Sequence, residues 1–420
     1  MSLFCQPINS TYFANFCGAP RNILVKIPNQ IENERISSSV NEFGFKLIKE
    51  LMRRNENENI VISPAGLLAM ALLGSVGESY EELARVLGFS EGERNRENHD
   101  HFGDLLRSLN INDTSSKTTY ADVIFSDKTS TLREAYRIYL NRVYVKIPQK
   151  IFDIKNKRDF NWLLTTHGFV LLSALYFSGQ WKYPFLIEYT KKLPFKGLTE
   201  DVMVEQMLNM GSFPYIFSHN DDLHMIALPY NDSVTTMYAL KPRRPNDLNL
   251  TELLNRLDFN KIDDLIAKME NRKCVIRYPK MNLQRTENLE ESLKAIGVRN
   301  IFKPGQANFA LMVDNNRVVN RTVNEIVSRI NTGDIDDSRS LKEVVDSLPN
   351  PGVYVDTVLH DVKLTVDEYG TEAVAATSGV LARSAELFYA DTPFFMFIRN
   401  ERTKLVTFSA VILNPKSFQT

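Results

Sequence analysis

The chain has 420 residues, of which 43% are hydrophobic and 24% are charged, and its formal net charge is -1. A chain of this length can bury a substantial core, and its balance of charges excludes a general electrostatic attraction to nucleic acid or to a membrane surface. No stretch reaches the roughly 20 consecutive apolar residues that a membrane-spanning helix needs, so we expect an ordinary soluble globular protein.

The first half of the chain predicts helices with strands between them. Val40, Phe43, Leu47, Ile48 and Leu51 recur at helical spacing from Ser39 to Arg54, behind a serine-rich start that can cap a helix. NIVISP then predicts a short buried strand, and AGLLAMALLG and ESYEELARVLG predict two helices, the second ending at Gly88. YADVIFS, from Tyr120 to Ser126, predicts a strand. TLREAYRIYLNRV after it predicts an amphipathic helix, which has on one side Leu132, Ala135, Tyr136 and Tyr139.

Beyond Gly168 the pattern changes to strands. FVLLSALYF is a continuous apolar run, which is typical of a strand that is covered on both faces. LHMIALPY, VTTMYAL, KCVIRYP and TVLHDVKLTV predict further strands, and TELLNRL, IDDLIAKM and NLEESLKAIG predict helices between them. We therefore expect an α+β domain built around a large sheet.

Two segments lie outside this pattern. Residues 1–36 are a poorly patterned extension before a single domain at 37–420. Residues from about 310 to 353 contain a helix-like patch, the polar turn NTGDIDDSRS and the breaker-rich PNPG. We interpret this second segment as a surface insertion, and the alternative is a partner-binding module.

The cysteines, the N-terminus and the glycosylation sequons do not decide between a secreted and an intracellular protein. Cys274 lies in the alternating run KCVIRYPK and is expected in a packed strand, while a pairing of Cys5 with Cys17 stays open. The N-terminus lacks a basic region followed by an uninterrupted apolar run, so as written it does not predict a secretory signal peptide. Glycosylation sequons, which would suit a secreted glycoprotein, occur at Asn9, Asn112, Asn231, Asn249 and Asn320.

The segment VDEYGTEAVAATSGVLARSAELFYADTPFF, from Val366 to Phe395, carries small residues between two glycines. The stretch between the glycines is too short for a stable isolated helix. As a strand, it would place small side chains on one face, namely Thr371, Ala373, Ala375 and Thr377. Such a strand could slide between the strands of an existing sheet with little steric resistance.

No sequence motif predicts an enzyme. The chain contains no P-loop, GxGxxG, HExxH or GxSxG pattern. His99 and His101 are expected to be solvated side chains at a charged helix start, because a third metal ligand is missing. We expect no catalytic residues, no metal and no cofactor.

Four blocks in order, from about Ser39 to Pro415, resemble the serpin family. NIVISPAGLLAMALLGSVGESYEELARVLGF resembles the family's early strand and helices, and LLSALYFSGQWKYPF its central-sheet motif. VLHDVKLTVDEYGTEAVAAT resembles the strand and hinge that lead into the reactive-centre loop, and PFFMFIRNERTKLVTFSAVILNP resembles the C-terminal strand pair. The resemblance implies the serpin fold, with a large central mixed β-sheet, further sheets, surrounding helices and an exposed reactive-centre loop, here at 370–390.

The resemblance also implies a serine-type endopeptidase inhibitor that acts as a suicide substrate, with its cleaved loop inserted into the central sheet. Loop length places the reactive bond at Arg383–Ser384, with Ser384–Ala385 as the alternative, and Arg383 is the only basic residue of the loop. An arginine bait implies a trypsin-like serine protease as the partner of a monomeric inhibitor. The alternative is a non-inhibitory serpin with a binding, carrier or chaperone-like role. Family habit favours secretion, and a cytoplasmic location is the alternative.

Supporting positions carry over from the family residue by residue. The hinge corresponds to Glu368, Gly370, Thr371, Glu372, Ala373, Ala375, Ala376 and Thr377. The positions that support sheet opening correspond to Lys280, Trp181, His360, Ser173 and Ser63. Glu368 and Lys280 match an ion pair near Trp181, and Ser173 replaces the asparagine that usually partners the buried histidine, here His360.

The chain departs from the family pattern in three places. Gly168 leads almost directly into FVLLSALYF, where the family has more than a dozen further residues, so we expect a shortened strand where the sheet opens. The insertion at about 310–353 is the second departure, and Thr392, Ser409 and Ala410 in the C-terminal motif are the third.

Overall fold

The fold is seen in a computed structural model that describes residues 30–63, 66, 68–89, 96–108, 115–125, 131–134, 136–138, 169–314, 348–369 and 385–416. Its helices are α1 (Gln30–Arg54), α2 (Ala69–Gly74), α3 (Glu78–Val86), α4 (Arg96–Ser108), α6 (Leu250–Arg256), α7 (Phe259–Ala267) and α8 (Glu290–Ala295), with 3-10 turns η2 (Ile187–Tyr189) and η3 (Asn300–Phe302). Its strands are β1 (Ile60–Ile62), β2 (Ser116–Phe125), β3 (Thr131–Leu132), β4 (Phe169–Gly179), β5 (Lys191–Lys196), β6 (Asp201–Ser218), β7 (Leu223–Pro229), β8 (Thr235–Pro242), β9 (Glu270–Pro279), β10 (Met281–Asn288), β11 (Val313–Asp314), β12 (Val355–Val366), β13 (Glu386–Tyr389), β14 (Phe394–Asn400) and β15 (Val406–Ile412).

A nine-stranded sheet forms the larger part of the core. Its path is β1-β15-β14-β8-β7-β6-β9-β13, and β5 pairs with β6 beside that path. Every residue of β8, β14 and β15 is buried, so these adjacent strands form the interior of the sheet. The predicted apolar face of α1, including Val40, Phe43 and Leu47, is buried, and α1 packs on β15 and β1.

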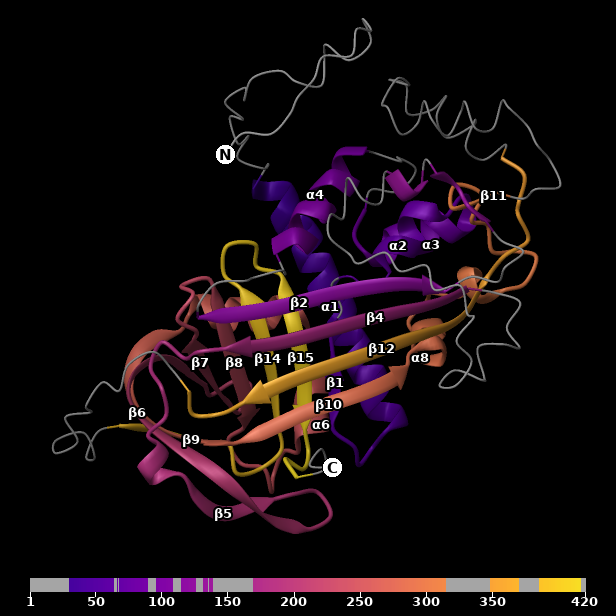
Figure 1. Ribbon diagram of the computed structural model, residues 1–420. Coiled ribbons are helices and arrows are strands. Elements are labelled where there is room, and N and C mark those ends of the chain that lie inside the picture. The colour runs from indigo at the N-terminus through magenta and orange to yellow at the C-terminus, as the bar shows by residue number, and fades with distance from the viewer. Residues whose placement is uncertain are drawn as a thin grey trace, which may run out of the picture.

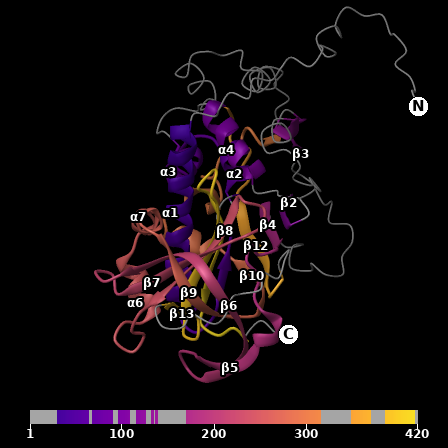
Figure 2. The same ribbon diagram turned by 90° about the vertical axis from the view of Figure 1, so that its left-hand side faces the viewer.

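A four-stranded sheet, with the order β10-β12-β4-β2, lies in front of β14, β15 and α1 in Figure 1. Its central pair, β4 and β12, is parallel, whereas both outer pairs are antiparallel. The parallel pair extends from Val355 opposite Phe169 to Leu364 opposite Phe177. Because β4 and β12 run in the same direction, both end on the side of the molecule where β6 and β9 lie (Figures 1 and 2).

The resulting α+β architecture of several sheets and surrounding helices confirms the expected fold class. The expected strands beyond Gly168 are present, and so are the helices between them. Gly88 has a φ of 76° just beyond α3, where the left-handed conformation lets glycine end a helix. Cys274 is a buried residue of β9, as predicted.

No residue of β4 is exposed, and buried and half-buried residues alternate from Leu171 onward, so both faces of this strand are at least partly covered. Two other local predictions were wrong. Leu132 lies in β3, paired with Val313 of β11, so it does not belong to the predicted amphipathic helix. His99 is buried against the ring of Phe89, with ring centroids 5.3 Å apart, and is not the solvated side chain that its charged neighbours indicated.

No helix among the described ranges is long and apolar enough to cross a membrane.

Candidate functional site

The parallel contact between β4 and β12, called the seam below, is where the predicted support residues meet. His360 and Ser173 face each other in the middle of the seam, since they are register partners. Glu368, Lys280 and Trp181 gather at its end, where β12 leads toward the predicted hinge. The seam therefore has two levels, its middle and its hinge end. The strand β4 is paired with β2 over Val170–Gly179, so the predicted shortening leaves a strand that still matches its neighbour's length.

At the hinge end, Glu368 is held on both carboxylate oxygens. Lys280 Nζ lies 2.9 Å from Oε2, and the Thr190 hydroxyl donates to Oε1 at 2.9 Å. The side chain of Glu368 is only 6% exposed, whereas that of Lys280 is 40% exposed. Phe185 N also donates to the Glu368 carbonyl at 3.2 Å, so the backbone here is tied to the segment that follows β4.

These contacts set the charge of Glu368. Burial acts to raise the pKa of this carboxyl group, but hydrogen bonds from Lys280, the backbone and Thr190 outweigh burial and hold the pKa below its usual value. The same ion pair raises the pKa of Lys280. Both groups are therefore charged at neutral pH.

Trp181 closes the same end of the seam from the side of β4. Its indole is buried and stacks on Tyr230, with ring centroids 4.4 Å apart. The indole Nε1 donates to the Asp367 carbonyl at 2.7 Å, and the Trp181 backbone N–H donates to the Tyr369 carbonyl at 3.0 Å. Two hydrogen bonds thus join Trp181 to the last described residues before the hinge.

In the middle of the seam, His360 is completely buried and lies close to Ser63. The Ser63 backbone N–H donates to His360 Nε2 at 2.7 Å, so this nitrogen is an acceptor and the neutral ring carries its proton on Nδ1. Burial lowers the pKa of His360 to about 4, which keeps the ring neutral at physiological pH.

Three polar atoms in this middle level have no hydrogen-bond partner among the described residues: His360 Nδ1, Ser173 Oγ and Ser63 Oγ. All three side chains are buried. The Ser173 hydroxyl thus makes no hydrogen bond to the His360 ring, although the Ser173 backbone lies close enough to act against burial and raise the pKa of His360. A buried polar atom without a partner costs on the order of 1–3 kcal/mol.

The predicted bait and most of the hinge lie outside the described residues. These positions are Gly370, Thr371, Glu372, Ala373, Ala375, Ala376, Thr377, Arg383 and Ser384. The same holds for the bulk of the predicted insertion, at 315–347. The described chain resumes after the bait at Ala385, and β13 then pairs in parallel with β9 as the outermost strand of its sheet.

Sequence reasoning missed two residues at the hinge end, Thr190 and Tyr230. Thr190 is 178 positions from Glu368 in the chain, and Tyr230 follows β7 and forms an isolated bridge with Trp181. No local pattern marks either residue, because each contact depends on how distant strands cross. Within the ranges that the structure describes, no cluster of three histidine, cysteine or acidic residues is arranged to hold a metal ion.

Comparison with known protein families gives a match that extends over most of the chain. The family described as Serpin (serine protease inhibitor) matches residues 38–161 and 160–415. The two matched pieces overlap at residues 160 and 161, shortly before Gly168, after which we expected part of the family pattern to be absent.

Among curated proteins, serine protease inhibitor 28Dc of Drosophila melanogaster is 27% identical over 91% of this chain and 80% of its own length. The leukocyte elastase inhibitor of Xenopus tropicalis is 25% identical over 89% of this chain and 98% of its own length. Among solved structures, uncleaved ovalbumin has a TM-score of 0.72 at 20% identity, and the match covers 90% of this chain and 100% of ovalbumin.

Proposed function

The chain belongs to the serpin family, and we propose that it inhibits a trypsin-like serine protease by acting as a suicide substrate. Its relatives are named as serine protease inhibitors, which supports protease inhibition in general. The observation that carries the finer proposal is the parallel β4–β12 pair, whose end lies next to the predicted hinge.

The parallel pairing of β4 with β12 suits the insertion of a strand that turns back after β12. Parallel strands cannot be joined by a tight turn, so β4 and β12 have no short connection of their own. A chain that turns back at Gly370 would run antiparallel to β12 and, since β4 is parallel to β12, also antiparallel to β4. Insertion therefore replaces one parallel pair with two antiparallel pairs, which are slightly more stable per residue.

The small hinge residues suit such a strand. With Thr371, Ala373, Ala375 and Thr377 on one face, the new strand needs little room above the core. To enter, it must separate Trp181 from Tyr369 and Phe185 from Glu368, which are now joined by backbone hydrogen bonds. The hinge end of the seam is thus the first barrier to insertion.

The chemistry is supplied by the protease. Its serine hydroxyl attacks the Arg383 carbonyl, an ester forms between Arg383 and that serine, and the bond to Ser384 breaks as the leaving nitrogen takes up a proton. In the proposal, loop insertion then moves the ester-linked protease before water can hydrolyse the ester. The arginine guanidinium is suited to a specificity pocket with a carboxylate at its floor.

The remaining features of the proposal follow from family membership. Serpins act as inhibitors and are generally not catalysts, so we assign no enzyme activity, cofactor or metal to this chain. The family has both secreted and intracellular members; we propose an extracellular glycoprotein because sequons such as Asn231 and Asn249 are available, and a cytoplasmic protein is the alternative.

The direct test is incubation with sub-stoichiometric trypsin, followed by denaturing electrophoresis and intact-mass measurement. We expect a stable adduct and release of a C-terminal fragment that begins at Ser384. Arg383→Ala should abolish the adduct with trypsin. Thr371→Arg should keep cleavage at Arg383 but lose the adduct, because a long charged side chain would stop the inserting strand.

A non-inhibitory serpin is the second candidate, and the unpaired polar atoms at Ser173 and His360 are the observation that favours it. A seam that departs from the usual bonding there need not open in time for inhibition. This alternative predicts cleavage at Arg383 with fully active trypsin, no adduct and no rise in melting temperature after cleavage.

A further inference from the structure

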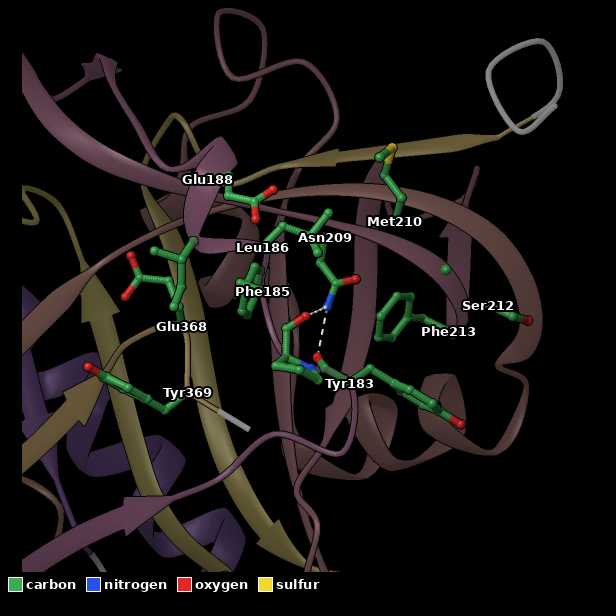
Figure 3. Close-up of a pocket in the computed structure, with 13 residues that line it drawn as sticks. Tyr183, Phe185, Leu186, Glu188, Asn209, Met210, Ser212, Phe213, Glu368 and Tyr369 are labelled. Carbon is green, nitrogen blue, oxygen red and sulfur yellow. Dashed lines mark hydrogen bonds between the residues drawn. The ribbon is translucent and has the colours of Figure 1, made fainter. Parts of the chain in front are cut away.

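A cavity of about 450 Å³ lies beside the hinge end of the seam. One wall is the segment Tyr183–Glu188 that follows β4, a second is Asn209–Phe213 of β6, and a third is the pair Glu368 and Tyr369 at the end of β12 (Figure 3). Its volume is within the range of small-molecule binding sites. The cavity therefore touches both sides of the contact that must open if a strand is to insert.

Aromatic rings form much of the lining. Tyr183 and Phe213 meet edge to face, with centroids 5.7 Å apart, and Phe185 lies deeper, where its ring is buried. Leu186 and Met210 add aliphatic surface to the lining. Such a lining suits the apolar body of a ligand, and ring faces also attract cations.

The charged and amide groups of the lining favour a ligand that donates hydrogen bonds. Asn209 Nδ2 donates to the carbonyls of Tyr183 and Pro184, at 2.8 and 3.1 Å, which fixes the amide and leaves its Oδ1 as an acceptor. Glu188 is exposed and makes no ion pair with the described residues, whereas Glu368 is already paired with Lys280. The lining contains these two carboxylates and no lysine, arginine or histidine.

We propose that this cavity binds an organic cation, a small molecule with an aromatic or aliphatic body and a protonated amine or guanidinium group. The rings hold the body, and Glu188 and Asn209 Oδ1 accept hydrogen bonds from the charged head. We further propose that the occupied site holds the seam closed, a consequence that rests on the loop insertion proposed above.

The coupling follows from where the walls lie. Phe185 and Glu368 face the same cavity from opposite sides of the seam and are joined by the 3.2 Å backbone hydrogen bond. A ligand that contacts both walls binds the closed arrangement better than the opened one. By linkage it must then slow any strand that enters between those walls.

Binding is tested by calorimetry on the uncleaved full chain, with 4-phenylbutylamine as the probe and 4-phenylbutan-1-ol as the uncharged match. We expect one amine bound per chain and an alcohol affinity that is lower by about tenfold. Glu188→Gln should weaken amine binding by about three- to fivefold, while Glu205→Gln, an exposed carboxylate of β6 that does not line the cavity, should not change it.

A second variant fills the cavity. A Cβ at Gly211 would lie 3.1 Å from the Phe213 ring, so Gly211→Leu should abolish binding of the amine. The proposal is overturned if the amine does not bind at millimolar concentration, if amine and alcohol bind equally, or if Glu188→Gln leaves the affinity unchanged. If Gly211→Leu fails to fold, the affinity of Glu188→Gln for the amine still tests whether the cavity binds the cation.

The effect on the seam is tested without any protease. A synthetic peptide of residues 371–383 is incubated with the uncleaved chain, and its incorporation is followed by the rise in melting temperature. At ten times its Kd, the amine should slow incorporation by about tenfold, and the alcohol at the same concentration much less. Incorporation at an unchanged rate with the amine bound overturns the coupling. Amine binding without any peptide incorporation, with or without ligand, contradicts the proposed insertion and the coupling that rests on it, and leaves the cation site standing.

Discussion

The two levels of the seam differ in how their polar side chains are paired. At the hinge end, both carboxylate oxygens of Glu368, the indole N–H of Trp181 and the Thr190 hydroxyl have partners, and only the buried Tyr230 hydroxyl of the residues named there has none among the described residues. In the middle, His360, Ser173 and Ser63 each keep a buried polar atom without a partner among the described residues. Trp181, Ser173, His360 and Glu368 belong to β4 and β12 or to the segments that directly follow them, whereas Ser63 follows β1 and Lys280 lies between β9 and β10.

This difference shows where the closed sheet is held. Opening the hinge end breaks side-chain hydrogen bonds and an ion pair, whereas opening the middle breaks mainly the backbone ladder and exposes polar atoms that gain water. The hinge end, called the lock below, therefore holds the closed sheet by side-chain contacts that the middle lacks. Each prediction below would break or sharpen this contrast.

The largest effect is expected from Trp181→Ala. Removing the indole leaves a cavity beside Tyr230 and frees the Asp367 carbonyl, so we expect the free energy of unfolding to fall by about 4 kcal/mol. Urea denaturation measures this change. Tyr183→Ala, which removes an exposed aromatic ring of the same segment, should cost less than about 1 kcal/mol. Equal losses in both variants would show that Trp181 is not part of a lock.

Glu368→Gln tests the ion pair at the same level. We expect a loss of about 2 kcal/mol at pH 7, since a nearly buried charge partner of Lys280 disappears. The folded-state pKa of Glu368 is lowered, so its contribution is present above the ordinary carboxyl pKa and is lost as the pH falls through that value. The difference between wild type and variant should therefore shrink below about pH 4.5. A difference that stays constant down to pH 3 would contradict this assignment.

The middle level should respond to pH through His360. Its folded-state pKa, about 4, is below the ordinary value, so the unfolded chain binds more protons and stability falls as the pH drops from 6.5 toward 4. We expect His360 to account for about 2 kcal/mol of the stability lost between pH 7.5 and 5. Compared with wild type, His360→Asn should reduce this dependence without removing it, because burial also lowers the pKa of His224 to about 4. If the free energy of unfolding of His360→Asn depends on pH as steeply as that of wild type, His360 does not contribute to the pH dependence of stability.

The smallest effects give the sharpest contrast, because two hydroxyl groups are expected to act with opposite sign. Thr190→Ala removes a hydroxyl that donates to Glu368 and should destabilise the fold by about 1 kcal/mol. Ser173→Ala removes an unpaired buried hydroxyl and should be neutral or stabilising by up to about 1 kcal/mol. Thermal unfolding of the two variants measures both. If Ser173→Ala is as costly as Thr190→Ala, the Ser173 hydroxyl has a partner and the contrast fails.

Local patterns in the sequence predicted most elements of the fold. The apolar runs at β4, β7, β8 and β12 and the helical spacing in α1 depend on neighbours a few residues apart, and such periodicity is visible in a single chain. Leu132 escaped this reasoning because a two-residue strand, β3, has no period of its own. His99 escaped it because Phe89, which covers its ring, lies in a different segment.

The site was less accessible to sequence reasoning than the fold. The resemblance to serpins indicated the right neighbourhood for Glu368, Lys280 and Trp181, which the structure brings together. It could not indicate Thr190 or Tyr230, whose contacts with Glu368 and Trp181 join segments that are far apart in the chain. The cavity beside Glu368 has the same origin, since its three walls come from segments that no local pattern connects.

The most direct test of loop insertion is a reversible cross-link across the seam. Ala174 and Asp361 are register partners on β4 and β12, so the double variant Ala174→Cys with Asp361→Cys places two thiols within disulfide reach. Oxidised, this variant should be cleaved by trypsin without forming an adduct; reduced, it should form the adduct, and the wild type should behave alike in both conditions. An adduct of equal yield with the disulfide intact would contradict insertion between β4 and β12.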